Sequence, residues 1–185
     1  MKVSAEEKSH THLKILQSAS KLFRARGIQS TSVVDVMNEV GLTHGGFYRH
    51  FKNKDELVKS AVTESFNEIV DQLKDSRPKI APKELISHYS QNYLSKRHIN
   101  NPQLGCPIST LGQEISRESS DIKDAFSKGV EEIIEQLKNG FTGSENEKNH
   151  KAIKQLSILV GAVVISRAVN ADIAKKILNA CEEFI

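Results

Sequence analysis

Cysteine and proline are scarce in this chain of 185 residues, which contains two cysteines and four prolines. Two cysteines, Cys106 and Cys181, are too few for a zinc framework or a disulfide lattice. Four prolines and ten glycines exclude a collagen-like or low-complexity chain. The composition is therefore that of an ordinary globular protein.

Long hydrophobic runs are also missing. The longest candidate, 156–165, is interrupted by Ser157 and Gly161, whereas a membrane-spanning helix needs about 18 apolar residues in a row. Residues 1–8 contain no apolar segment of the kind found in a signal peptide. We therefore expect a cytoplasmic protein with no membrane partner.

Motifs of the common enzyme classes are missing as well. The sequence contains no glycine-rich phosphate loop, no His-Glu-x-x-His and no Gly-x-Ser-x-Gly. His88 and His98 lie ten residues apart, with no carboxylate nearby at the spacing of a metal ligand. We expect a protein that is not an enzyme, with no catalytic residues, no metal site and no cofactor.

Positive charge is concentrated in the first third of the chain. Residues 1–55 contain nine lysines and arginines against five acidic residues, whereas residues 56–185 contain one more acidic than basic residue. Four of the seven histidines also lie in residues 1–55. This distribution predicts a polyanion as the partner of the N-terminal third.

Apolar residues recur at helical spacing along the whole chain, which predicts an all-α fold. The first helix has Thr11 as its N-cap and ends at Gly27. Its apolar stripe is Leu13, Leu16, Ala19, Leu22 and Phe23. The later predicted helices are 33–40, 44–51, 54–73, 83–97, 108–116, 120–137, 151–168 and 171–183.

The two short helices on either side of Gly41 form a helix-turn-helix. Helices of about eight residues do not persist alone, so their apolar faces must pack on the first helix. The residues left on the outer face of the second short helix are rich in hydrogen-bond donors, as expected of a helix that enters a DNA groove. They are Thr43, His44, Gly45, Gly46, Tyr48, Arg49 and His50.

Gly45 and Gly46 are unusual because each glycine in a helix costs about 1 kcal/mol relative to alanine. One interpretation is that the helix backbone closely approaches the sugar-phosphate chain of DNA. The other is that the segment Thr-His-Gly-Gly is a plain turn between two helices. The capped helices on both sides favour the DNA interpretation.

Residues 31–57 resemble the DNA-binding signature of TetR/AcrR-family transcriptional regulators. The segment Gly-Leu-Thr-His-Gly-Gly-Phe-Tyr-x-His-Phe is typical of one branch of that family. The resemblance covers about 11–65, with weaker similarity at 105–114 and 160–169. It implies a helix-turn-helix DNA-binding domain at 9–69, followed by a helical ligand-sensing and dimerisation domain at 70–185.

The resemblance also implies roles for individual residues. Thr43, His44, Gly45 and Gly46 match the start of the helix that faces the groove. Tyr48, Arg49 and His50 match positions that contact bases or backbone. Thr31, Ser32 and Lys54 match phosphate contacts at helix N-termini. Such a protein is a sequence-specific regulator, of the ligand-responsive repressor type, that binds a palindromic operator in duplex DNA as a homodimer.

The last two helices are the candidate dimer interface because they are more apolar than one buried face requires. The predicted interface residues are Leu156, Leu159, Val160, Val163, Val164, Ile173 and Ile177. The alternative is a helix pair buried within one subunit. The resemblance favours a four-helix bundle shared by two subunits.

The middle helices are the candidate site for a small-molecule effector, because several aromatic and aliphatic residues with few polar groups are typical of such a site. The candidates are Tyr89, Tyr93, Cys106, Leu111, Ile115, Phe126 and Ile133. The alternative is that these residues are ordinary core. Cys106 stands at a possible helix start, where a thiolate is favoured, although it is also typical of a buried small hydrophobe.

Two other functions stay open at this point. The chain resembles its family in fold, but it could be a helical protein-interaction dimer that has lost DNA binding. It could also act as a thiol-based sensor of electrophiles or oxidants through Cys106.

Overall fold

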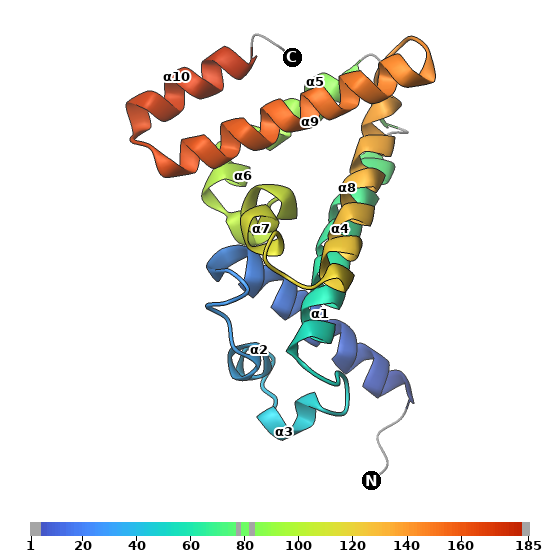
Figure 1. Cartoon of the computed structure of the whole chain (residues 1–185), viewed down its shortest axis with the longest axis vertical. Helices are drawn as coiled ribbons and strands as arrows, with labels where there is room; N and C mark the ends of the chain where they lie inside the picture. Colours follow the sequence, from blue (N-terminus) through green and yellow to red (C-terminus); the bar gives the residue numbers. More distant parts are fainter. Residues whose placement is uncertain (1–4, 77–78, 82–83, 183–185) are drawn as a thin grey trace.

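The computed structural model describes residues 5–76, 79–81 and 84–182, and every regular element in these ranges is helical (Figure 1). The all-α prediction is therefore confirmed. The elements are α1 (Ala5–Arg26), α2 (Val33–Glu39), α3 (His44–Phe47), α4 (Lys54–Ser76), α5 (Leu85–Tyr93), α6 (Lys96–Asn100), the 3-10 helix η3 (Pro102–Leu104), α7 (Pro107–Ile115), α8 (Ser120–Lys138), α9 (Glu145–Ala168) and α10 (Ala171–Glu182).

Helices α1, α2 and α3 form one end of an elongated molecule, and α9 and α10 form the other (Figure 1). The long helix α4 connects the two ends, packing on α1 at its start and against α8 along its length. Because α4 continues without interruption through residues 69 and 70, no break in the helix marks the predicted domain limits. The limits 9–69 and 70–185 stay a prediction.

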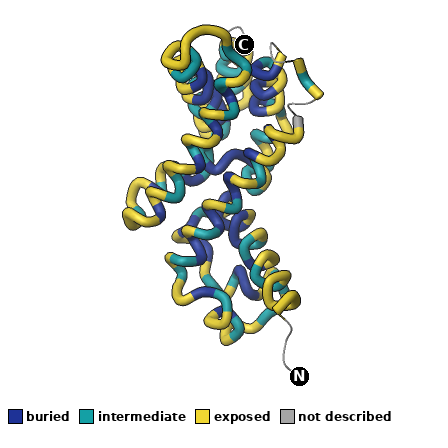
Figure 2. Tube along the Cα trace, turned by 90° about the vertical axis from the view of Figure 1, so that its right-hand side faces the viewer, coloured by how far each residue is buried: buried dark blue, intermediate teal, exposed yellow. Residues whose placement is uncertain are grey.

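One hydrophobic core cluster runs through both ends of the molecule, as the buried segments in Figure 2 show. Phe66 of α4 lies between α4 and α8. Its ring covers Gly129 of α8 so closely that a side chain at residue 129 would collide with it. Phe126 meets Phe66 edge to face, with ring centroids 5.2 Å apart. These contacts fix α8 against α4.

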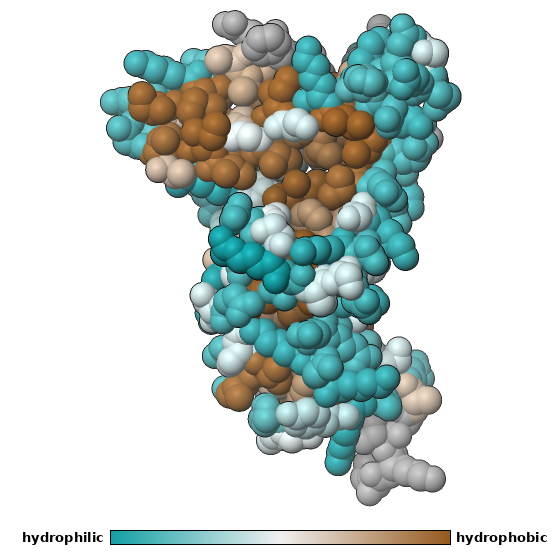
Figure 3. All heavy atoms as spheres, in the orientation of Figure 1, coloured by the Kyte–Doolittle hydropathy of each residue, from teal (hydrophilic) through white to brown (hydrophobic). Residues whose placement is uncertain are grey.

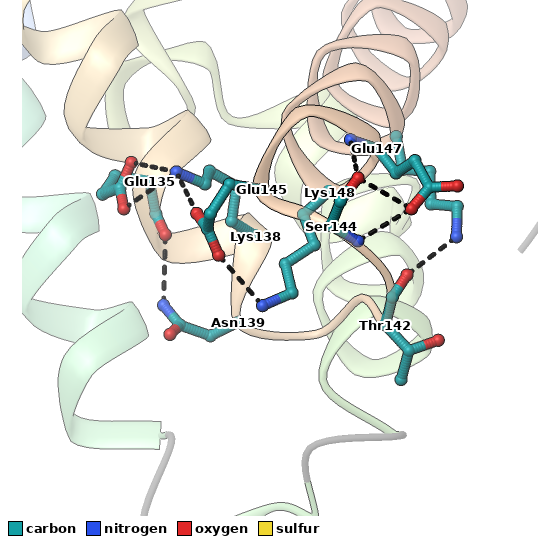
Figure 4. Close-up of polar contacts among 9 residues, drawn as sticks. Glu135, Lys138, Asn139, Thr142, Ser144, Glu145, Glu147 and Lys148 are labelled. Carbon is teal, nitrogen blue, oxygen red and sulfur yellow. Dashed lines mark hydrogen bonds and ion pairs between the residues drawn. The ribbon is translucent and has the colours of Figure 1, made fainter.

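Capping side chains determine where two of the helices begin. Ser32 and Asp35 form a reciprocal capping box at the start of α2, and Ser144 and Glu147 form another at the start of α9 (Figure 4). Lys138, at the end of α8, bonds Glu145 in the first turn of α9 at 3.1 Å. Helix α9 therefore starts well before residue 151, where the sequence analysis placed it.

Helix α1 differs from its prediction. It begins by Ala5, so Thr11 lies inside the helix and donates to the Glu7 carbonyl instead of capping the N-terminus. Leu13, predicted to be core, is 43% exposed, and Ile15 is fully buried instead. The stripe that α1 buries is rotated because α4, η3 and α7 cover it as well as α2.

The single helix predicted at 83–97 is two helices in the structure. Residue 83, where the prediction began, lies outside the described residues. Helix α5 ends at Tyr93, and the Ser95 hydroxyl accepts the His98 N–H to cap α6. Ser and Thr side chains compete with the helix backbone for such bonds. The chain therefore changes direction at Leu94.

Candidate DNA-binding site and ligand cavity

We call residues 44–51 the recognition segment. Its helix is shorter and more irregular than predicted. Helix α3 ends at Phe47 rather than at residue 51, because the N–H groups of Arg49 and His50 bond carbonyls three residues back, as in a turn. Phe47 and Phe51 are buried, and their rings stack with centroids 5.6 Å apart. These two rings anchor the segment to the core and leave its other face open.

The outward side of this segment carries the predicted DNA-contacting groups. Tyr48 is 64% exposed, although it is an aromatic residue. His44 meets its ring edge to face, with centroids 5.7 Å apart. The exposed members of the predicted set are Ser32, Thr43, His44, Gly45, Tyr48 and Arg49. They form one donor-rich surface across α2 and α3.

Nothing within the chain requires glycine at positions 45 and 46. A methyl group at Gly45 would meet no atom within 4 Å, and one at Gly46 would meet the terminal carbon of Met37 at 3.6 Å, which is ordinary contact. Neither residue has a positive φ. Met37 is fully buried beneath α3, so the space inside is filled. Contacts within the chain therefore do not explain the two glycines.

Thr31 and Lys54, two of the predicted phosphate contacts, both bond carbonyl oxygens within the chain. Thr31 is fully buried, and its hydroxyl donates to the Gly27 carbonyl at 2.8 Å, so its side chain does not reach the surface. The prediction for the Thr31 side chain is wrong because its hydroxyl is used in a bond within the α1–α2 connector. The Lys54 ammonium donates to the Ile28 carbonyl at 2.7 Å, which holds this connector. The roles of Ser32 and Lys54 toward DNA stay predictions.

His50 is half-buried beside α1. Its ring lies 5.8 Å from that of His12, which in turn stacks on Phe51 at 4.6 Å. Burial lowers the pKa of His50, and the neighbouring His12, Lys8 and Arg49 lower it further. Both effects favour the neutral form of the imidazole.

A cavity of about 450 Å³ lies among α4, α5, α6 and η3. Tyr89, Tyr93 and Cys106 line it, as predicted. Leu111, Ile115 and Ile133 do not, since they are buried in the core between α7, α8 and α9, and Phe126 packs on Phe66. The predicted ligand residues thus fall into two groups, those that line the cavity and those that pack in the core. Lining residues that the sequence analysis missed include Glu68, Ile69, Gln72, Leu73 and Leu85.

Cys106 lies at the inner wall of this cavity as a neutral thiol. Burial raises its pKa. Burial also lowers the pKa of neighbouring His98 to about 4, and both ring nitrogens of His98 are occupied. The Nδ1–H donates to the Tyr93 carbonyl and Nε2 accepts the Cys106 N–H. Because no cationic imidazole stabilises a thiolate, the geometry does not favour the thiol-sensor alternative.

A buried arginine joins the DNA-binding end to the cavity. Arg24 of α1 is 3% exposed. Its guanidinium donates to Glu68 of α4 at 2.6 Å, to the Gly105 carbonyl at 2.9 Å and to the Ser20 hydroxyl at 2.9 Å. Since Glu68 lines the cavity, one side chain connects α1, α4 and the segment before α7.

A second connection runs through α7. Cys106 precedes this helix, and Glu114 lies near its other end. The Glu114 carboxylate accepts the N–H groups of Ile28 and Gln29 at 2.8 and 3.1 Å. It fits there because Gly27, with φ of 90°, has no side chain to meet it. Helix α7 therefore contacts the cavity at one end and the α1–α2 connector at the other.

The predicted dimer residues divide between two faces of α9. Leu156, Leu159 and Val163 are buried in their own subunit, so their assignment to the dimer interface is wrong. The opposite side of α9 and the adjoining side of α10 form an apolar patch (Figure 3). We define this C-terminal patch as Ile153, Val160, Val164, Ile165, Val169, Ile173 and Ile177, of which Val160 and Ile177 are partly buried and the others exposed.

In the described ranges no helix has the length and apolarity needed to cross a membrane. The same ranges contain no group of three or more His, Cys, Asp or Glu side chains placed to hold a metal ion.

Residues 15–61 match the family model for bacterial regulatory proteins of the tetR family. Over 156 residues the chain is 24% identical to the HTH-type transcriptional regulator YerO of Bacillus subtilis, which covers 83% of this chain and 53% of YerO. Over 68 residues it is 38% identical to the HTH-type transcriptional regulator TtgR of Pseudomonas putida, covering 37% of this chain and 32% of TtgR. The chain thus aligns with about half the length of YerO and a third of TtgR.

The fold is that of solved TetR structures over nearly the whole chain. A TetR-family transcriptional regulator from Cytophaga hutchinsonii superposes with a TM-score of 0.80 at 19% identity, covering 99% of this chain and 96% of that one. The helix-turn-helix and the helical domain behind it both lie within this similarity. Residues 15–61, which contain the helix-turn-helix, thus match the tetR family of bacterial regulatory proteins, and the chain has the fold of solved TetR-family regulators.

Proposed function

We propose that this protein is a ligand-responsive transcriptional repressor that binds a palindromic DNA operator as a homodimer. The observation that carries the proposal is the open recognition surface. Donor-bearing side chains surround Gly45 and Gly46, whose backbone is bare although the chain has room for methyl groups there. A protein-interaction dimer that had lost DNA binding would not need to keep this surface. The family match over residues 15–61 supports the same choice.

The C-terminal patch supports dimerisation. Helix α10 packs mainly on α9 and extends away from the body of the molecule (Figure 1), and exposed Val164 and Ile173 are 46% and 41% accessible to solvent. A second copy applying the same patch would cover both helices around a two-fold axis. Two recognition segments held in this way can read two half-sites about 34 Å apart, or a multiple of that distance.

The cavity and its two connections support a ligand response. A molecule that enters the cavity contacts two structures that also hold the DNA-binding end. The first is Glu68, which binds Arg24 of α1, and the second is α7, whose Glu114 binds the α1–α2 connector. It lowers DNA affinity if it binds more tightly to an arrangement in which the two recognition segments are wrongly spaced.

DNA binding should weaken steeply with salt, because phosphate contacts release counterions. For a dimer that neutralises about six phosphates, affinity should fall roughly 10³-fold between 50 and 200 mM salt. Fluorescence anisotropy with a palindrome selected from random duplexes measures this slope. Binding that does not change across this range would contradict the proposal, as would failure to select any duplex.

Gly45→Ala should separate stability from DNA binding. The methyl group meets nothing in the chain, so the free energy of unfolding should rise by about 0.5 kcal/mol from helix propensity. DNA affinity should fall at least about tenfold, because the added carbon occupies the space of the approaching DNA backbone. Thermal unfolding and anisotropy on the same preparation measure both quantities.

Gly112→Ala is the matched control for this change. Gly112 lies in α7, where an added methyl would meet only the Phe126 ring edge at 3.9 Å. It should give a similar gain in stability with unchanged DNA affinity. If Gly45→Ala also left the DNA affinity unchanged, the two glycines would be no more than a turn.

A further inference from the structure

Tyr89 has a hydroxyl group that the fold leaves without a partner. The residue lies in α5, is 8% exposed and lines the cavity. Its hydroxyl oxygen is buried and makes no hydrogen bond to any described residue, and the same is true of the Tyr93 hydroxyl in the same cavity. Buried polar groups are almost always paired, and an unpaired one costs about 1–3 kcal/mol. A molecule in the cavity that accepts a hydrogen bond would remove this cost.

The inner end of the cavity is uncharged. Burial raises the pKa of the Tyr89 and Tyr93 hydroxyls and of the Cys106 thiol, so all three keep their protons. His98 is neutral, and both of its nitrogens bond the backbone. The remaining buried wall is Leu73 and Leu85. A charged group placed here would lose its hydration with no opposite charge to replace it.

The charged side chains that line the cavity are either paired with an opposite charge or exposed to solvent. Glu68 lines the cavity, but its carboxylate is held by Arg24. Arg97 and His88 also line it, and both are exposed to solvent. The polar groups at the mouth therefore face water, and the interior favours an apolar body.

The shape of the cavity suits a flat or aromatic molecule. Its volume of about 450 Å³ lies within the range of small-molecule sites. The rings of Tyr89 and Tyr93 lie along one wall, with centroids 5.6 Å apart, and the Tyr93 ring continues to His98 at 4.4 Å. Aromatic rings favour offset or edge contacts with other aromatic rings.

We propose that the cavity binds an uncharged, largely apolar molecule whose hydrogen-bond acceptor, such as a ketone oxygen, receives the O–H of Tyr89. The proposal deepens the ligand-responsive function given above and rests on it only for the effect of the ligand on DNA. It excludes anionic ligands, such as acyl carriers with phosphates, from the inner end.

Three probes with one skeleton test this inference by calorimetric titration of the free protein without DNA. Benzophenone has an acceptor oxygen, diphenylmethane has the same two rings without it, and 4-benzoylbenzoate adds a negative charge. The wild type should bind benzophenone about tenfold more tightly than diphenylmethane, the ratio expected for one hydrogen bond. It should bind 4-benzoylbenzoate at least about tenfold more weakly than benzophenone.

Tyr89→Phe should abolish the preference for benzophenone by weakening that probe about tenfold, with diphenylmethane unchanged. The variant should melt at the same temperature or higher, because it loses an unpaired hydroxyl, so misfolding does not explain the loss. Tyr93→Phe is the comparison, because the Tyr93 hydroxyl is also buried without a hydrogen-bond partner but has the Cys106 and Ser109 side chains beside it. It should keep the preference.

Several results would overturn the inference: an unchanged preference in Tyr89→Phe, a lost preference in Tyr93→Phe, tighter binding of 4-benzoylbenzoate, or no binding of benzophenone at its solubility limit. Because no DNA is present, this failure is distinct from failure of the proposed function. A protein that binds benzophenone but no DNA would contradict only the latter.

Discussion

Val164→Asp and Ile173→Asp should each convert the proposed dimer to a monomer. In a single chain both positions are largely exposed, so the new carboxylate stays in water and the subunit keeps its fold. In the dimer, the two-fold axis buries two such carboxylates in an apolar interface, at a cost of several kcal/mol each. The dimer dissociation constant should therefore rise by at least about 10³-fold. Sedimentation over a range of protein concentrations measures it.

The same variants should lose DNA affinity by at least about 100-fold, because a monomer contacts one half-site and about half of the phosphates. Asn179→Asp is the control. It adds a carboxylate to an exposed position of α10 about 200° around the helix from Ile177, so it should leave both assembly and DNA binding unchanged. Dimers of Val164→Asp that sediment like the wild type would show that the C-terminal patch is not the interface.

Arg24→Ala should destabilise the protein by about 2–3 kcal/mol, because the Gly105 carbonyl and the partly exposed Glu68 carboxylate lose a charged hydrogen-bond donor. The change removes the donors to Glu68 and to the Gly105 carbonyl together. For a domain of this size the melting temperature should fall by roughly 10 °C. Denaturant unfolding monitored by circular dichroism measures the free energy of unfolding directly.

Arg26→Ala is the matched control, because Arg26 lies two residues away on α1 and is exposed. Its effect should stay within about 0.5 kcal/mol. Glu68→Gln keeps an oxygen that accepts from Arg24 but removes the opposite charge, so its effect should lie between those of Arg24→Ala and Arg26→Ala. A loss below about 1 kcal/mol in Arg24→Ala would mean that this arginine does not hold α1 to α4.

Arg24 and Glu114 connect the cavity to the DNA-binding end of the same subunit. Arg24 and Glu114 both bind backbone or side chains across the junction between α1 and the rest of the molecule. Neither contact lies on the recognition surface or on the C-terminal patch. In the proposed function, a ligand near Glu68 and Cys106 would therefore act on the position of α1 and the α1–α2 connector, rather than on the DNA contacts themselves.

The sequence by itself determined that the chain is helical and where the recognition segment begins. Helical spacing, the Ser32 cap and Gly41, whose φ of 71° favours glycine, are local signals that act within a few residues. For that reason the start of α2, the turn after it and the exposed side of α3 could all be predicted. The family resemblance at residues 31–57 added the role of this segment in DNA binding.

Only the tertiary structure decided which face of each later helix turns inward. Leu159 and Val164 are both apolar residues of α9, but α8 and the core cover the first and leave the second exposed. Burial of Thr31 and the partners of Arg24 depend in the same way on segments far away in the chain. A helical repeat shows that an apolar stripe exists, but not whether its own subunit or a second molecule covers it, because the hydrophobic effect has no direction.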